Sequence, residues 1–369
     1  MILTGLSLTN FRIHKSASLN FSDTLNYIVG GNGQGKTSIL EAAYFLCTTK
    51  SFNSKDSEAV NFEENDFEIK GTFKDITEDK IRLLFSGIEN RKYYFQNEKL
   101  ISRSSQIIGK FPVVILTPAD HAITHGSPAE RRKIFDSVIS QASSTYLELL
   151  LDYNKTLKQR SAVLNLLKDR RTKQLEEEFD AWTEKLIVSG LELIKYRNNF
   201  LEDFNSFVLD SYKKIVENVE IPSIEYLFLE GADKNNIKST FEMLINDKRE
   251  EEIRRSQNLV GPHKDDFIFK IDNINLRTYG SQGQHKTFQT ALRFAEFFYL
   301  KKATGKTPIF LLDDVFGELD AYRAGKISDY LKEVGQAFIT LTDFADFSFL
   351  SRGPEDFVIR LNNGNIKYV

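Results

Sequence analysis

The chain has 369 residues, a length that allows two domains or one large domain with a substantial insertion. Hydrophobic residues make up 41% and charged residues 27%, so the chain can bury a core and is not disordered as a whole. A single cysteine, Cys47, excludes a disulfide framework and a multi-cysteine zinc site. The net charge of -3 excludes nucleic-acid binding through a globally basic chain, so any such function must rest on local patches.

No stretch of the sequence resembles a membrane or export segment. No apolar run approaches the ~18 residues that a transmembrane helix needs. Residues 1–8 alternate apolar with small polar residues and have no basic region ahead of an apolar one, so they predict a strand and not a signal peptide. The low cysteine content fits a reducing compartment. We therefore expect a cytoplasmic protein with no membrane partner.

Alternating and apolar runs predict an α/β protein with a helical insertion. Strands are predicted at residues 2–8, 18–21, 25–29, 67–73, 80–85, 92–96, 111–116, 309–312 and 337–341, with a hairpin at 267–271 and 274–276. Helical patterns cover residues 34–47 and 284–302. The simplest arrangement is one lobe built from residues 1–118 and 303–369, and a second, inserted lobe spanning residues 119–302.

The middle of the chain carries two series of core positions in a heptad register, separated by the polar stretch 168–174. The series are Tyr146, Leu150, Tyr153, Leu157, Arg160, Leu164 and Leu167, then Leu175, Phe179, Trp182, Leu186, Ser189, Leu193, Tyr196 and Phe200. Two facing seams predict a short antiparallel helical hairpin over about residues 143–200. At ~1.5 Å per residue each arm is about 35 to 45 Å long. An ordinary helical subdomain that buries the same residues is the alternative.

A phosphate-binding loop follows the predicted strand 25–29 and opens the predicted helix 34–47. Its pattern is G-x-x-x-x-G-K-[ST], with the strand before it and the helix after it that the motif requires. The residues expected to bind the nucleotide are Gly30, Gly31, Asn32, Gly33, Gln34, Gly35, Lys36, Thr37 and Ser38. Backbone N–H groups and the positive helix end face the phosphates, Lys36 bridges the β- and γ-phosphates, and the Thr37 hydroxyl ligates Mg²⁺. The loop alone does not separate kinases, GTPases and motor ATPases, and only together with the rest of the chain are ATP and Mg²⁺ the predicted cofactors.

The apolar run 309–312 ends in two carboxylates, Asp313 and Asp314. A buried parallel strand presents its last residues at the edge of the sheet where ligands bind in α/β folds. We predict that Asp313 holds Mg²⁺ and that Asp314 accepts a proton from the attacking water as the catalytic residue. Two solvated acids at a strand end are the alternative when this run is taken alone.

A loop of small and polar residues precedes the predicted helix 284–302. Its residues Gly280, Ser281, Gln282, Gly283 and Gln284 could be only a helix cap, because Ser and Gly are common at helix starts. In ABC-type ATPases, however, a signature loop of this kind precedes the acidic strand and binds the γ-phosphate of ATP held by the opposite subunit. Glu318 and Asp320 stand where the D-loop of such ATPases follows the acids.

Taken together, these segments resemble the RecF recombination mediators, relatives of the SMC-type head ATPases. The segments that carry the resemblance are Leu8 to Arg12, Gly33 to Thr37 with Leu40 to Ala42, Gly126 to Pro128 with Arg131 and Arg132, Leu157 to Arg160, Gly261 to Asp266, Gly280 to Gln284, and Leu311 to Asp314 with Glu318 to Asp320. The resemblance implies an ABC-type head with short helical arms and an ATP-dependent homodimer. It also implies binding at DNA gaps or junctions, slow DNA-stimulated ATP hydrolysis used as a switch, and cooperation with RecR-like and RecO-like partners that load recombinase.

Other ATPase classes fit the sequence less well. The ATPase subunit of a membrane transporter is the main alternative, but it gives no reason for the heptads. It would also carry a histidine after the predicted strand 337–341, where this chain has Thr342 and Asp343 as positional candidates. A P-loop kinase would need an acceptor pocket and lid, and an SMC-like nuclease would need a further metal-ligand cluster. The glutamine that completes such sites in ABC proteins is not identified.

Local positive charge points to where DNA could bind. Between Ser127 and Lys173 ten lysines and arginines oppose five acids, which gives +5 on a chain that totals -3. Such a patch is the footprint of a surface that follows phosphates, although a solvated helix face is the alternative. The predicted DNA contacts are Arg131, Arg132, Lys158, Arg160, Lys168, Arg170, Arg171 and Lys173.

Overall fold

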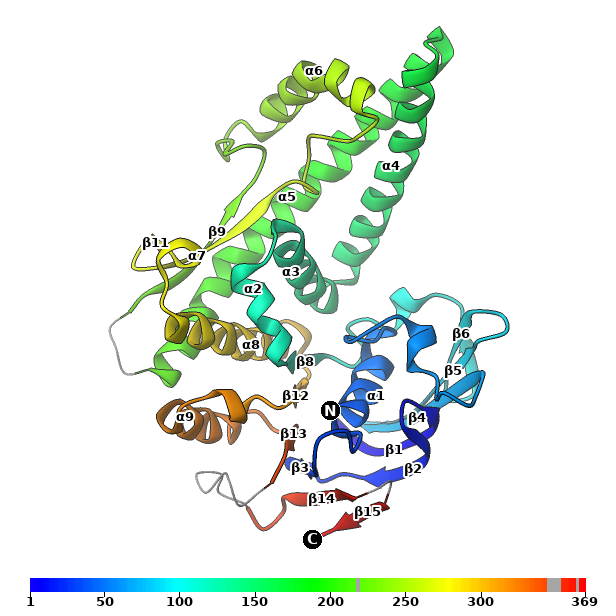
Figure 1. Ribbon diagram of the computed structural model, residues 1–369. Coiled ribbons are helices and arrows are strands. Elements are labelled where there is room, and N and C mark those ends of the chain that lie inside the picture. Colours follow the sequence, from blue (N-terminus) through cyan, green and yellow to red (C-terminus); the bar gives the residue numbers. More distant parts are fainter. Residues whose placement is uncertain (217–219, 344–352, 363–364) are drawn as a thin grey trace. The chain divides into compact units, whose positions relative to one another are not determined.

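The structure, a computed structural model, describes residues 1–216, 220–343, 353–362 and 365–369 (Figure 1). The chain divides into two compact units. Unit 1 comprises Met1–Asp120, Asp210–Asn218 and Thr290–Val369, and unit 2 comprises His121–Leu209 and Val219–Gln289. Two long helices therefore contribute residues to both units. The lobe boundaries expected from the sequence stay a prediction.

One of the two sheets of unit 1 is mainly parallel. Its order is β15-β14-β3-β13-β12-β8, and only β15 runs antiparallel to its neighbour. The strands are β3 (Leu25–Val29), β8 (Val113–Leu116), β12 (Ile309–Leu312), β13 (Ala337–Leu341), β14 (Phe357–Asn362) and β15 (Asn365–Tyr368). Every residue of β3, β8, β12 and β13 is buried, as expected for strands covered on both faces. The predicted strands 25–29, 309–312 and 337–341 are confirmed residue for residue, whereas no strand is predicted over β14 or β15.

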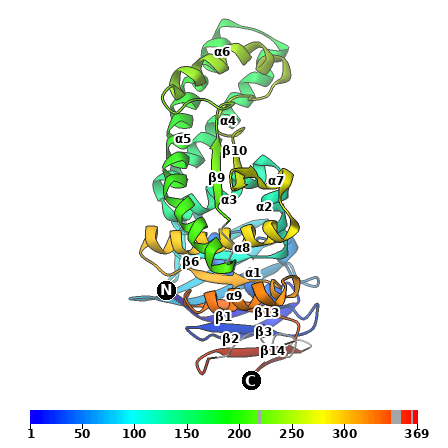
Figure 2. The same cartoon turned by 90° about the vertical axis from the view of Figure 1, so that its left-hand side faces the viewer.

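The second sheet of unit 1 is antiparallel, in the order β2-β1-β4-β5-β6-β7. Its strands are β1 (Ile2–Phe11), β2 (His14–Asn20), β4 (Asp66–Lys74), β5 (Glu78–Ser86), β6 (Arg91–Gln96) and β7 (Lys99–Ile101). Helix α1 (Lys36–Thr48) packs against strands of both sheets (Figure 2), and its apolar side chains join one core with theirs. Helix α9 (Ala321–Leu331) also belongs to unit 1.

Helices dominate unit 2. They are α2 (His121–His125), α3 (Pro128–Ala142), α4 (Ser144–Asp169), α5 (Lys173–Ile215), α6 (Ile237–Arg255) and α7 (Leu276–Tyr279), with α8 (Gln282–Thr304) shared between the units. A small sheet has the order β11-β10-β9, from β9 (Pro222–Leu227), β10 (Asp266–Ile271) and β11 (Ile274–Asn275). The hairpin of β10 and β11 is confirmed, and β9 is an addition that the sequence did not predict.

Helices α4 and α5 lie antiparallel, as the heptads predict. The contacts run in opposite directions along the two helices: Tyr146 meets Tyr196, with ring centroids 5.7 Å apart, and the later Asp152 meets the earlier Lys185 in an ion pair at 2.8 Å. The 26 residues of α4 span about 39 Å, whereas the 43 residues of α5 span about 65 Å. The longer helix continues past Phe200 because buried side chains recur at helical spacing as far as Ile215. None of the helices in the described ranges combines the length and apolarity needed to cross a membrane.

Candidate functional site

The phosphate-binding loop connects β3 to α1 and is held at both ends. Gly30 N donates to Leu341 O at 3.1 Å, which joins the loop to the end of β13. Gly35 precedes α1 with φ of 87°, a left-handed conformation that glycine adopts without steric cost. A Cβ atom at Gly35 would lie 2.4 Å from the Nε2 atom of His14, so space as well as conformation requires glycine there. The same His14 atom lies 3.2 Å from Gly35 O.

Lys36 is folded into this loop and is 8% exposed. Its Nζ atom donates to Gly30 O at 2.5 Å and to Gly31 O at 3.0 Å. Burial lowers the pKa of Lys36, and the carboxylates of Asp314 and Asp313 act in the opposite direction. The ammonium group is therefore placed among backbone carbonyls and between the loop and the acidic strand, where a phosphate oxygen would be a favourable partner.

The acidic strand meets the loop through Asp313 at the end of β12. The Thr37 hydroxyl lies 2.9 Å from Asp313 Oδ1 and 3.0 Å from Oδ2, although 276 positions separate the two residues. Burial raises the pKa of Asp313, opposed by the hydrogen bonds that Thr340 and Thr37 donate to it. The parallel register of β12 and β8 supports this position, because Asp313 N donates to Leu116 O.

The donor set at this point fits Mg²⁺. A hydroxyl and a carboxylate are hard oxygen ligands, and Mg²⁺ usually takes only one or two protein ligands together with waters and substrate phosphates. Among the described residues there is no group of three or more His, Cys, Asp or Glu side chains that could hold a metal ion. The chemistry of Thr37 and Asp313 is therefore compatible with a nucleotide-bound Mg²⁺.

The predicted catalytic acid Asp314 follows directly and is exposed. Its φ of 49° is left-handed, which is uncommon for a residue with a side chain. The backbone N–H of Asp314 donates to the Thr340 hydroxyl at 2.8 Å. The conformation therefore has a specific hydrogen-bonded support from β13.

The other loop residues are exposed or half-buried. Gly31, Asn32 and Gly33 are exposed at the loop crest, and Gly33 has φ of 75°. Gln34 and Ser38 are half-buried beside the start of α1. The backbone of the loop is thus accessible where phosphates would approach.

The signature loop belongs to unit 2 and caps α8. Ser281 N donates to Gln284 Oε1 at 2.9 Å and Gln284 N donates to Ser281 Oγ at 3.2 Å, a reciprocal arrangement typical of helix starts. The Gln284 amide also donates to Glu220 at 3.0 Å. Ser281, Gln282 and Gly283 are therefore presented at a helix start, an arrangement that agrees with a cap and with an anion-binding loop alike.

The D-loop candidates Glu318 and Asp320 both precede α9, which begins at Ala321. Asp320 is the N-cap of α9 and accepts a hydrogen bond from Arg323 N at 2.9 Å, while the side chain of Glu318 lies outside the described part of the chain. Beyond β13, Thr342 is half-buried and Asp343 is exposed.

Sequence reasoning assigned no role to two interactions close to the loop. Thr340 is hydrogen-bonded to both Asp313 and Asp314. In the sequence it could have been noticed as the one hydroxyl residue in the otherwise apolar run 337–341. Arg12 forms a paired contact with Glu41 of α1, with nitrogen to oxygen distances of 2.8 and 2.6 Å, and donates to Glu58 O at 2.7 Å. Both residues of this pair lie in the segments that carry the family resemblance, but no spacing rule predicts their contact.

Two of the predicted DNA contacts are corrected by the structure. Arg160 is fully buried and bonds Thr183, Asn258 and Glu252 at 2.6 to 2.9 Å, so its side chain cannot reach a phosphate. Arg131 is 3% exposed and forms a paired contact with Asp266 at 2.8 Å. Both arginines occupy positions inside unit 2 where buried charge is stable only when it is paired.

The remaining predicted contacts are accessible to different degrees. Arg132 is half-buried and donates to Asp265 O. Lys158 is exposed on α4. At the α4–α5 turn four exposed cations gather, which we call the arm-tip cluster: Lys168, Arg170, Arg171 and Lys173. Arg171 pairs with Glu250 and Lys173 with Glu177, whereas Lys168 and Arg170 have no ion pair within the described residues.

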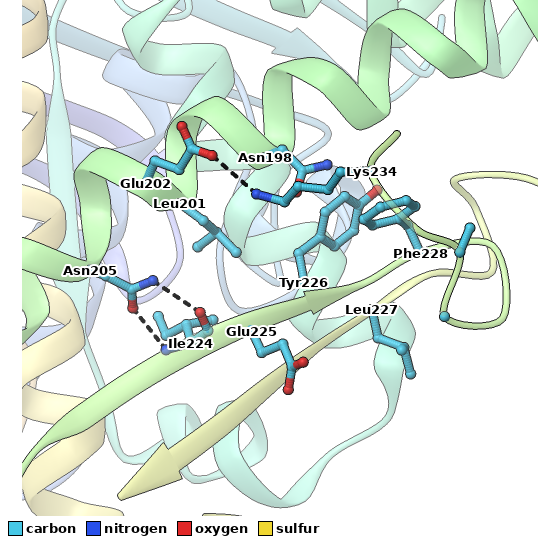
Figure 3. A pocket seen from close by; sticks show the side chains of 12 residues that line it. Asn198, Leu201, Glu202, Asn205, Ile224, Glu225, Tyr226, Leu227, Phe228 and Lys234 are labelled. Atoms are coloured by element: carbon cyan, nitrogen blue, oxygen red, sulfur yellow. Dashed lines mark hydrogen bonds and ion pairs between the residues drawn. The ribbon is translucent and has the colours of Figure 1, made fainter. Parts of the chain in front are cut away.

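A separate pocket of about 410 Å³ lies between α5 and β9 in unit 2 (Figure 3). Its polar side chains are already paired: Asn205 with the backbone of Ile224 at 2.8 and 3.0 Å, and Glu202 with Lys234 at 3.0 Å. No residue predicted from the sequence to bind nucleotide or DNA lines this pocket.

The chain is similar to known proteins over most of its length. Residues 2–345 match the family described as RecF/RecN/SMC N terminal domain. The DNA replication and repair protein RecF of Chloroherpeton thalassium is 39% identical over 358 residues, covering 94% of this chain and 96% of that protein. The RecF of Salinibacter ruber is 37% identical over 350 residues, covering 93% of this chain and 85% of that protein.

A solved structure extends the likeness to the whole fold. The structure of the recombination mediator protein RecF-ATP in the RecFOR pathway superimposes with a TM-score of 0.90 at 32% identity, covering 100% of this chain and 97% of that chain. The sequence likeness covers 93 to 94% of the chain and the likeness in fold covers 100% of it. The chain therefore belongs to the RecF/RecN/SMC family and, within it, to the RecF proteins of DNA replication and repair.

Proposed function

We propose that this protein is an ATP-binding recombination mediator of DNA replication and repair that works with RecO-like and RecR-like partners. Its relatives are named DNA replication and repair protein RecF, and structures of RecF with ATP and with ATPrS are described within the RecFOR pathway. Membership of the RecF family disfavours the transporter alternative. The cytoplasmic location stays a prediction.

The contact between Thr37 and Asp313 carries the proposal for nucleotide chemistry. In this proposal the loop from Gly30 to Ser38 cradles the phosphates, and Lys36 exchanges its two carbonyl partners for phosphate oxygens. Thr37 and Asp313 hold Mg²⁺, which when bound neutralises charge on the phosphates. Asp314 orients the attacking water and accepts its proton.

ATP joins two copies of the chain in this proposal. The signature residues Ser281, Gln282, Gly283 and Gln284 of one copy contact the γ-phosphate held by the other, and the D-loop residues Glu318 and Asp320 lie beside them. Lys36 belongs to unit 1 and Ser281 to unit 2, so the two elements are not parts of one compact unit. ATP shifts the equilibrium toward dimer because its γ-phosphate has these partners only there. Slow hydrolysis is then the release step.

Two variants separate nucleotide binding from hydrolysis. Lys36→Met removes the cation of the loop, so we expect ATP binding and ATP-dependent dimers to disappear. Asp314→Asn keeps the binding groups, so dimers should form with ATP and persist because hydrolysis stalls. Light scattering with and without ATP measures both. Dimers of unchanged amount without nucleotide would contradict the proposed switch.

We further propose that duplex DNA is held through its phosphates by the arm-tip cluster, with Lys158 along α4, on the inner face of an ATP-bound dimer at a gap or junction. The exposure of these cations supports it, whereas burial removes Arg131 and Arg160 from the DNA-binding set. Removing one phosphate-binding cation should reduce the salt slope of log affinity by about 0.9.

Binding to duplex, single-stranded and gapped DNA, with and without ATP, tests this proposal. Lys168→Glu with Arg170→Glu should weaken binding. It should also reduce the slope of log affinity against log salt by the amount expected for about two phosphate contacts. Lys74→Glu with Lys99→Glu, exposed on the antiparallel sheet of unit 1, is a control of equal charge change. Equal losses in both double variants would show only a net-charge effect and would refute the assignment to the arm tip.

A further inference from the structure

Thr340 stands alone as a polar side chain in the strand between the phosphate-binding loop and the acidic strand. It is 1% exposed, and the other four residues of β13 are apolar and fully buried. Strand β13 pairs with β3 on one side and with β12 on the other. A buried hydroxyl is costly unless it is hydrogen-bonded, so its partners indicate what it does there.

The hydroxyl has two partners, one from each acid. Thr340 Oγ1 lies 2.9 Å from Asp313 Oδ1 and 2.8 Å from Asp314 N. The Asp314 N–H can only donate, so the single hydroxyl proton is directed to the Asp313 carboxylate. The result is a chain that runs from the Asp314 backbone through Thr340 to Asp313, in which each bond polarises the next.

This chain fixes two different properties of the site. It orients the Asp313 carboxylate, and it supports the left-handed backbone of Asp314, whose φ is 49°. Thr37 is the other donor to Asp313, but its hydroxyl is itself a proposed metal ligand. Thr340 is therefore the donor that can hold Asp313 without taking part in metal binding.

We propose that Thr340 is a positioning residue that couples the metal-binding carboxylate of Asp313 to the backbone on which Asp314 is mounted. The inference rests on the proposed ATPase function and assigns Thr340 no contact with nucleotide. Without this hydroxyl the Asp313 carboxylate keeps only Thr37 of its two threonine donors, and the Asp314 N–H loses its partner. Mg²⁺-dependent steps should suffer, and binding of the nucleotide alone should not.

Thr340→Val tests the coupling because valine keeps the shape and suits a buried parallel strand. The affinity of a fluorescent ATP analogue is measured in excess EDTA and in Mg²⁺, together with kcat and KM for ATP. In EDTA we expect the affinity of the wild type. The increase in affinity on adding Mg²⁺ should be at least about tenfold smaller than in the wild type, as for loss of a hydrogen bond to a charged group. The kcat should also fall, and KM for ATP in Mg²⁺ should rise by about the factor lost from the Mg²⁺ gain, because KM follows the dissociation constant when hydrolysis is slow.

Two controls separate positioning from folding. Thr340→Ser keeps the hydroxyl and should restore both the Mg²⁺ gain and kcat. Thr4→Val removes a threonine hydroxyl that bonds Thr72 O in the same unit and should change neither. A Thr340→Val protein with the wild-type Mg²⁺ gain and kcat overturns the inference, as does a serine variant that behaves like valine. A wild-type protein that binds no ATP would instead overturn the proposed function.

Discussion

Replacing Arg160 by methionine should destabilise unit 2 strongly, although sequence reasoning placed this arginine on the DNA. Its guanidinium bonds Glu252 Oε2 and Asn258 Oδ1 at 2.6 Å and Thr183 Oγ1 at 2.9 Å, and lies 4.3 Å from the centre of the Phe179 ring. Arg160 and Glu252 are both 0% exposed. Removing one member of such a pair leaves a buried charge uncompensated, which costs about 3 to 5 kcal/mol.

That cost should appear as a large shift in melting temperature. For a unit of roughly 160 residues, 1 kcal/mol corresponds to about 2 to 4 °C. Arg160→Met should therefore melt about 6 to 20 °C below wild type. The only tryptophan, Trp182, packs against the cluster of Val163, Leu164, Leu167, Leu175, Phe179 and Ile253, so its fluorescence follows the unfolding of this region.

Two further variants test whether the loss of stability comes from the unpaired charge of Glu252. Lys185→Met removes a cation whose partner Asp152 is 43% exposed, and exposed pairs contribute only about 0 to 1 kcal/mol. Arg160→Met combined with Glu252→Leu removes both charges and should recover much of the loss, because apolar groups can replace a buried pair. If Arg160→Met unfolds within 1 kcal/mol of wild type in urea, as followed by Trp182 fluorescence, the reasoning is refuted.

The remaining predictions concern pH and the phosphate-binding loop. Burial lowers the pKa of His263 to about 4, so the stability it contributes is present above its ordinary value of 6.5 and is lost as pH falls toward 4. Burial raises the pKa of Asp265 to about 6, so its contribution is present below its ordinary value of 3.8 and is lost as pH rises toward 6. Each amounts to roughly 3 kcal/mol and they oppose one another. Urea unfolding between pH 4 and 6.5 should therefore show stability rising with pH in Asp265→Asn and falling in His263→Gln, and parallel curves would exclude the assignment. Gly35→Ala should lower the melting temperature more than Gly33→Ala, because both residues have positive φ but only Gly35 would place a Cβ against His14. Equal shifts by calorimetry would mean that His14 moves away without cost.

Much of unit 1 could be predicted because its strands are short, apolar and bounded by turn residues. The run Ile309 to Leu312 and the run Ala337 to Leu341 are such cases. The phosphate-binding motif also predicts the strand before it and the helix after it. The heptads likewise predict α4 and most of α5. These signals are local. A local pattern predicts the observed structure when it agrees with the burial of the same residues in the fold.

The failures arise where a pattern does not reveal its partners. Arg160 sits in a heptad core position, and charge alone made it a DNA candidate, whereas Glu252 lies 92 positions away and no spacing links the two. Thr340 looked like one residue in an apolar strand because its partners come from the end of a neighbouring strand. Strand β9 pairs with β10 across the whole of α6, and its isolated pattern is too short to predict a sheet.

The strand order around β3 also has a consequence for synthesis of the chain. Both lateral partners of β3, β13 and β14, come from residues 337 onward. At ~5 to 20 residues per second, the ribosome needs roughly 15 to 60 s after finishing β3 to make them. Throughout that interval β3 has two open edges, and the nascent chain carries a phosphate-binding loop without its acidic strand in place. We therefore expect nucleotide to stabilise the chain only after β13 has been made. A chain truncated before β13 is expected to aggregate through the open edges of β3 and not to form a partly active protein.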